Sequence, residues 1–186
     1  MSDNSSDPQA LSAEGRRNEK KSTAQQLVEL AKDCYDFGID TAGKPFGVRK
    51  NGHIARPLVG SKHSVRQELG GLLYHSTGRP ASQNALTEAM TVLEYEAQEQ
   101  GEPVDLALRV ARLSDSEILI DVGDKAERVI RVTSSGWQVL EGDADIPVRF
   151  RRTNLTAALP TPEPGGDLAQ LWKFVDMPGE GVQQLM

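Results

Sequence analysis

The spacing of the apolar residues changes once along this chain, near Pro103, and the change separates two kinds of secondary structure. Before Pro103 the apolar residues recur every three or four positions, which is the period of an amphipathic helix. After it, apolar and polar residues alternate, which is the period of a β-strand. The sequence therefore predicts an α+β fold, with an N-terminal three-helix cluster and a small β-hairpin, followed by an antiparallel β-meander of four to five strands.

Local start and stop signals set the boundaries of these elements. Ser22 and Ser64 each begin a capping box with a Gln three residues later, and Asn51-Gly52 is a two-residue hairpin signal. A short turn joins the second and third helices, which predicts a helix-turn-helix-like pair. The expected regions are a disordered tail at 1–21, a helical region with the hairpin at 22–100, an antiparallel β region at 103–159, and a Pro/Gly connector with a short amphipathic segment at 160–186.

Positive charge is concentrated in residues 44–67, which contain no acidic residue although the whole chain has a net charge of −6. Such a run indicates a surface that meets phosphate, and the alternative is a merely solvated basic face. A second, smaller basic cluster ends the last predicted strand, where the alternative is an edge strand protected by its charge. The predicted nucleic-acid contacts are Lys44, Arg49, Lys50, Arg56, Lys62 and Arg66 in the run, and Arg149, Arg151 and Arg152 in the second cluster.

The exposed first turn of the third predicted helix carries Gln83 and Asn84, whose side chains can hydrogen-bond base edges. The same helix becomes acidic further on, at Glu88 and Glu94, and most helix pairs with a short turn are simply packing units. Sequence-specific reading of DNA is therefore the narrower hypothesis, and non-specific contact through the basic run is the broader one.

Two apolar features of the sequence need to be shielded from water. Trp137 and Phe150 are expected to be buried on one face of the β region, where each would stabilise the sheet by about 2 to 3 kcal/mol. The C-terminal segment either folds back on the sheet or belongs to an element whose partner is a further domain. Its predicted partner-binding residues are Leu171, Trp172 and Phe174.

Several kinds of chemistry are not expected. The sequence has no G-x-S-x-G elbow, no H-E-x-x-H and no phosphate-binding loop. His53 and His63 have no Cys or carboxylate at ligand spacing, which makes a metal site unlikely on ordinary ligand geometry. The single cysteine, Cys34, excludes a disulfide framework, and the polar first 25 residues lack an export signal. We therefore expect a soluble cytoplasmic protein with no cofactor, no catalytic activity and no membrane association.

Short motifs along most of the chain resemble those of one family. They lie at residues 35–38, 85–89, 92–94, 108–112, 119–124, 136–137, 148–152 and 165–168. With these motifs, residues 26–178 resemble the region N-terminal to the motor in ATPases of bacterial phages and integrative elements, usually described as primase- or helicase-like. In that family the Gly-Gly-Asp-Leu segment leads toward a nucleotide-binding domain, whereas this sequence has no G-x-x-x-x-G-K-[ST] motif. The resemblance implies an accessory domain and no ATP hydrolysis by this polypeptide.

Two functions from different classes are expected. The first is a non-catalytic nucleic-acid-binding accessory domain of a mobile-element (phage or plasmid) replication protein, with DNA as the expected nucleic acid, either single or double stranded. The second is a protein-interaction module that docks a motor, such as an ATPase or helicase, or another partner through its C-terminal apolar segment. The salt dependence of DNA binding distinguishes the two functions, because only the first predicts a DNA affinity that falls steeply as the salt concentration rises.

Overall fold

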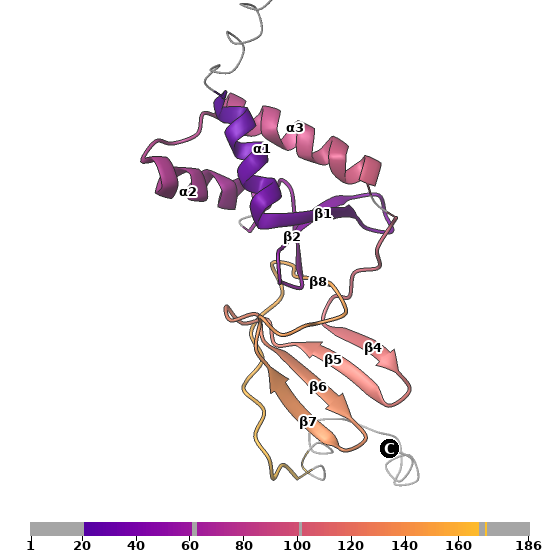
Figure 1. Cartoon of the computed structure of the whole chain (residues 1–186). Helices are drawn as coiled ribbons and strands as arrows, with labels where there is room; N and C mark the ends of the chain where they lie inside the picture. Colours follow the sequence, from indigo (N-terminus) through magenta and orange to yellow (C-terminus); the bar gives the residue numbers. More distant parts are fainter. Residues whose placement is uncertain (1–20, 61–62, 101, 168–169, 171–186) are drawn as a thin grey trace, which may run out of the picture.

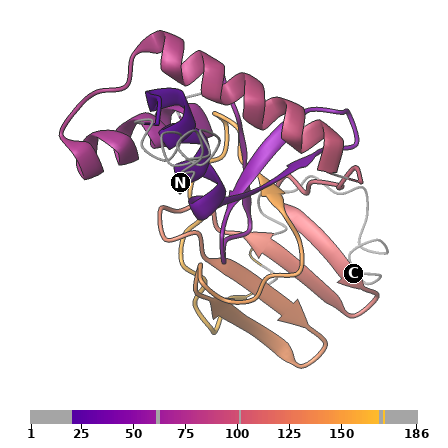
Figure 2. The same cartoon turned by 45° about the horizontal axis from the view of Figure 1, so that its top comes forward.

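The computed structural model describes residues 21–60, 63–100, 102–167 and 170. These residues form three α-helices and two four-stranded β-sheets. Figure 1 shows the helices at one end of the molecule, the second sheet at the other end and the first sheet between them. The turned view in Figure 2 keeps this order. Among the helices in these ranges, none combines the length and the apolar content that crossing a membrane requires.

Helix α1 (Thr23–Cys34) begins at the predicted capping box and passes directly into strand β1 (Tyr35–Ile39). The backbone N–H of Gln25 donates to the Ser22 hydroxyl at 3.2 Å, and the backbone N–H of Ser22 donates to the Gln25 side chain at 2.8 Å. At Tyr35 the backbone becomes extended, with φ −134°. The helix therefore ends without a loop, and residues predicted as its last turn form the first strand.

The first sheet is completed by a strand from a distant part of the chain. Its strands, in spatial order, are β1, β2 (Pro45–Arg49), β3 (Ile54–Pro57) and β8 (Phe150–Arg151). The first three are antiparallel, whereas β8 joins β3 in parallel. The N–H of Phe150 donates to the carbonyl of His53 at 2.8 Å, which fixes the register of this pair.

The helices α2 (Val65–Thr77) and α3 (Gln83–Gln100) share one apolar core with α1. Leu27, Leu69 and Leu93, one from each helix, are fully buried in it. Helix α3 contacts α1, β1 and β2, so one side of it is committed to packing. The second predicted capping box does not form, because the side chain of Ser64 makes no hydrogen bond at the start of α2.

The second sheet is a meander in which each strand is antiparallel to the next. Its strands are β4 (Val110–Ser114), β5 (Glu117–Asp121), β6 (Val129–Thr133) and β7 (Gly136–Leu140). One face supplies Leu119 and Val129 to a buried cluster that also contains Ile54 and Phe150 of the first sheet. The N–H of Arg151 donates to the carbonyl of Ala107 at 2.7 Å, so β8 lies between β3 and the chain that leads into the meander. The two sheets therefore share a core around Phe150.

The predicted arrangement of the fold is wrong. The helices do not form an N-terminal cluster beside a hairpin, because β1, β2 and β3 lie between α1 and α2 in the chain and belong to a four-stranded sheet. The strand predicted at the end of the meander, β8, pairs with β3 instead. The burial of Phe150 accounts for this: between the two sheets its ring is 0% exposed, whereas a fifth meander strand would place it on a single sheet face.

Candidate functional site

The predicted cations of the basic run converge on a carboxylate of the protein itself. Arg49 Nη2 lies 2.9 Å from Glu68 Oε2, and Arg56 Nη1 lies 2.7 Å from Glu68 Oε1. Arg56 also pairs with Glu127. The hydroxyl of Tyr35 donates to Glu68, and burial together with this hydrogen bond raises the pKa of Tyr35 to about 12. Glu68 therefore pairs with two arginines, from β2 and β3, and accepts a hydrogen bond from β1.

The second basic cluster is also engaged inside the protein. Arg152 makes two hydrogen bonds to the fully buried carboxylate of Asp121, at 2.6 and 2.9 Å. Arg151 pairs with the buried carboxylate of Asp40. Arg149 Nη1 donates to the carbonyl of Ile146 at 3.2 Å. These arginines therefore bind three different partners within the protein.

The remaining cations of the run are exposed but scattered. Lys44 and Lys50 lie in the turns at opposite ends of β2, where both are exposed. Six residues of extended chain separate them by about 20 Å. No ion pair is recorded for either lysine among the described residues. Lys62 lies outside the described residues. The described cations of the basic run therefore do not form a continuous exposed stripe.

The predicted base-reading side chains have different surroundings. Arg66 Nη2 donates to the side-chain oxygen of Gln83 at 2.8 Å and to the Thr87 hydroxyl at 3.3 Å, which ties α2 to the first turn of α3. Asn84, the next residue, is exposed. The predicted partner-binding residues Leu171, Trp172 and Phe174 lie outside the described residues.

A cleft of about 1080 Å³ lies where β3 faces the loops at 123–127 and 152–156. The charges that line it are largely matched within the protein, since Arg56 pairs with Glu127 and Arg152 donates to the carbonyl of Asp124 at 2.6 Å. The Asp124 carboxylate pairs in turn with Arg128 at 2.6 Å. In the ranges that the structure describes, no group of three or more His, Cys, Asp or Glu is placed to hold a metal ion. The cleft therefore shows no concentrated charge for a ligand.

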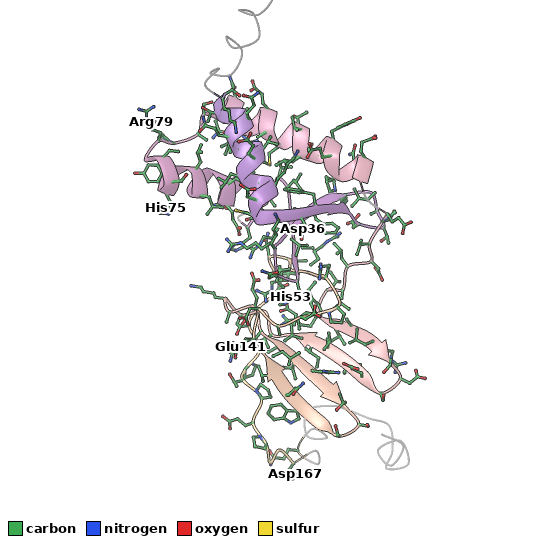
Figure 3. The ribbon with its side chains drawn as sticks, in the orientation of Figure 1. Asp36, His53, His75, Arg79, Glu141 and Asp167 are labelled. Atoms are coloured by element: carbon green, nitrogen blue, oxygen red, sulfur yellow. The ribbon has the colours of Figure 1, made fainter. Side chains whose placement is uncertain are left out.

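His53 is a polar residue in the shared core of the two sheets (Figure 3). It is 1% exposed, its ring contacts Phe150 edge-on at 6.0 Å between centroids, and neither ring nitrogen has a hydrogen-bond partner among the described residues. Burial lowers the pKa of His53 below its ordinary value, although the nearby carboxylates of Glu127 and Asp121 act in the opposite direction. His53 is therefore held neutral in the folded protein.

This burial predicts a pH-dependent loss of stability. The unfolded chain protonates His53 near pH 6.5 and the folded chain only at lower pH, so the stability present above about pH 6.5 is lost as the pH falls through the folded value. We expect His53→Phe to reduce the drop in unfolding free energy between pH 7.5 and pH 5, measured by urea unfolding. The control is His75→Phe at the exposed end of α2 (Figure 3). An equal drop in wild type and His53→Phe would contradict this assignment.

The feature that the sequence analysis missed is an apolar face on the meander. The register aligns its side chains in two cross-strand rows on the side opposite Leu119 and Val129. We call this surface the meander face; its residues are Val110, Ile120, Ile130 and Val139 in one row and Ile118, Val132 and Trp137 in the other.

Part of the meander face is open to solvent. Trp137 is 44% exposed and Val110 is 54% exposed, whereas Ile130 at the centre is buried. The expectation that Trp137 shares a buried face with Phe150 is therefore wrong. The run Ile118-Leu119-Ile120 was the signal available in the sequence, because consecutive apolar residues in a strand place apolar side chains on both faces.

Comparison of the chain with protein-family models, with curated proteins and with solved structures found no match. We therefore infer the function from the chain's own geometry.

Proposed function

We propose that this chain is a non-catalytic protein-interaction module that docks another protein through the meander face. The observation that carries the proposal is the alignment of seven apolar side chains in two rows, with Trp137 and Val110 exposed. Val110 and Trp137 lie on the two edge strands of this face, with half-buried or buried apolar residues between them. Exposed apolar side chains on a sheet face are typical of interaction sites, and partly exposed tryptophan is enriched among the residues that dominate binding energy.

The charge distribution gives less support to nucleic-acid binding. Arg49, Arg56 and Arg152 are held by the protein's own carboxylates, so phosphate contact would require breaking those pairs. Affinity for nucleic acid grows with the number of phosphates that a protein neutralises at once. Among the described residues, the predicted cationic contacts that make no ion pair are Lys44, Lys50, Arg66 and Arg149, and the last two donate to neutral oxygens of the protein. The DNA-binding accessory role remains a hypothesis with weaker support than protein docking.

The resemblance to the region that precedes the motor in phage and integrative-element ATPases favours a motor ATPase or helicase as the partner, in a mobile-element replication assembly. A cytoplasmic location belongs to the same proposal, and the unpaired thiol of Cys34 supports it, since free cysteines are usual in reducing compartments.

Photo-crosslinking from the meander face tests this function. We expect p-benzoylphenylalanine in place of Trp137 to form an adduct with one defined protein in cells that contain the chain's genomic neighbours. The matched control places the same amino acid at Gln138, which follows in β7 and points to the opposite side of the sheet. Mass spectrometry of the adducts would identify the partner.

The two positions give opposite expectations. A protein adduct that is abundant from position 137 and at least fivefold weaker from position 138 supports docking through the meander face. Equal adducts from both positions, or none with another protein from either, would rule it out.

A further inference from the structure

We propose that residues 168–186 of the same chain cover the meander face, so that an external partner docks by displacing them. The displacement step rests on the docking function proposed above, whereas the covering step does not. The size of the face, the place where the described chain ends, the composition of the segment and the charge at the rim of the face all favour this occupant.

The meander face has dimensions that a short segment can cover. Strands in a sheet lie about 4.8 Å apart, so a row across four strands is about 14 Å long. The two rows are separated by two residues along each strand, which is about 7 Å. A single helix or extended segment laid across the strands therefore reaches from Val110 to Val139 or from Ile118 to Trp137.

The described chain brings the segment to this sheet. The N–H of Leu159 donates to the carbonyl of Val122 at 2.8 Å, directly after β5. The chain then continues to Asp167, which Figure 3 places beyond β7 at the end of the meander that is far from the helices. Gly165 has φ +91°, a conformation that favours glycine and allows the chain to change direction. Residue 168 therefore starts within reach of the meander face.

The segment has the length and composition that the face requires. Residues 168–175 would span about 12 Å as a helix, which matches a row, or about 26 Å as a strand, which is longer than a row. Five of these eight residues are large and apolar: Leu168, Leu171, Trp172, Phe174 and Val175. Shielding Trp137 and Val110 with these side chains would remove exposed apolar area on both surfaces.

The charge at the rim matches the segment. Arg112 shares the meander face, because it lies opposite Ile118 in the register. Its side chain is 72% exposed, and its pair with the exposed carboxylate of Asp115 is long, at 3.7 Å. The segment carries Asp176 and Glu180 against one cation, Lys173. An acidic, apolar segment therefore fits this surface better than a basic one, in both its apolar contact and its charge.

Tryptophan fluorescence tests the covering step in the full chain. The chain has two tryptophans, so Trp172→Phe leaves Trp137 as the only reporter and keeps an aromatic ring at position 172. In this background, Leu171→Asp with Phe174→Asp should shift the Trp137 emission to the red and raise its acrylamide quenching constant at least twofold. Gln183→Asp with Gln184→Asp adds the same charge at polar positions of the segment and should leave both values unchanged.

A peptide of residues 168–186 that also carries Trp172→Phe gives a second readout, because unfolding would also expose Trp137. Added to the Leu171→Asp, Phe174→Asp variant, the peptide should restore the original emission and quenching. Failure of the peptide to restore them, no change in the double variant, or shielding that rises with protein concentration as for a second copy, would each overturn the inference. Shielding of Trp137 without a crosslinked partner from position 137 would refute the proposed function alone.

Discussion

Replacing Asp121 by alanine is expected to lower the free energy of unfolding by about 3 to 5 kcal/mol, the usual loss when one partner of a buried ion pair is removed. The Asp121 carboxylate is fully buried, accepts two hydrogen bonds from Arg152, and accepts a third from the N–H of Gly123 at 3.0 Å. Without it, the mostly buried guanidinium of Arg152 loses its counter-charge. The effect is measured by urea unfolding at pH 7.5.

Asp115→Ala is the matched control, since the Asp115 carboxylate lies in the same sheet but is fully exposed in a weak pair with Arg112 at 3.7 Å. A change within about 0.5 kcal/mol is expected for it. Arg152→Ala should also destabilise the protein. The loss of unfolding free energy in the double variant should differ from the sum of the two single losses, because the two residues act as a pair. A loss below about 1 kcal/mol for Asp121→Ala would mean that Arg152 is not committed to the fold.

Replacing Phe150 by alanine is expected to lower the free energy of unfolding by about 3 to 5 kcal/mol. Its side chain is 0% exposed and contacts His53 of the first sheet and the apolar cluster that contains Leu119 and Val129 of the meander. The cavity left behind would lie between the two sheets, where neither sheet can close it alone. Thermal and urea unfolding followed by far-UV circular dichroism measure the change.

Leu155→Ala is the control for this substitution, because Leu155 is 91% exposed a few residues later in the chain and should change the free energy by about 0.5 kcal/mol or less. A single unfolding transition of the Phe150→Ala protein, with a urea midpoint close to that of the wild type, would contradict this prediction. It would mean that the two sheets do not depend on Phe150.

Local signals in the sequence located several features of this fold, and contacts between distant residues decided the others. The capping box at Ser22 forms as its residues predict, because both of its hydrogen bonds are made within four residues. Strand β1 was missed, because Tyr35, Asp36 and Phe37 continue a helical pattern and become a strand only by pairing with β2. The parallel pairing of β8 with β3 depends on burial of Phe150 between two sheets, which no local pattern describes.

The charges show the same limit. The basic run ends at Gln67, and the next residue, Glu68, pairs with Arg49 and Arg56 once α2 is folded against β2 and β3. A count of charges along the sequence treats the basic run and Glu68 as separate features, whereas folding brings their side chains together. The acidic partners of Arg151 and Arg152 lie far away in the sequence, at Asp40 and Asp121.

A titration of fluorescein-labelled DNA tests most directly whether the binding surface is the meander face and not the basic run. Single- and double-stranded 30-mers are titrated with the full chain at 50 mM and 200 mM KCl and followed by fluorescence polarisation. We predict no saturable binding at protein concentrations up to about 100 μM at 200 mM KCl, the weak limit of non-specific DNA binders. Micromolar binding that weakens steeply with salt and is lost in Lys44→Glu, Lys50→Glu would contradict this account.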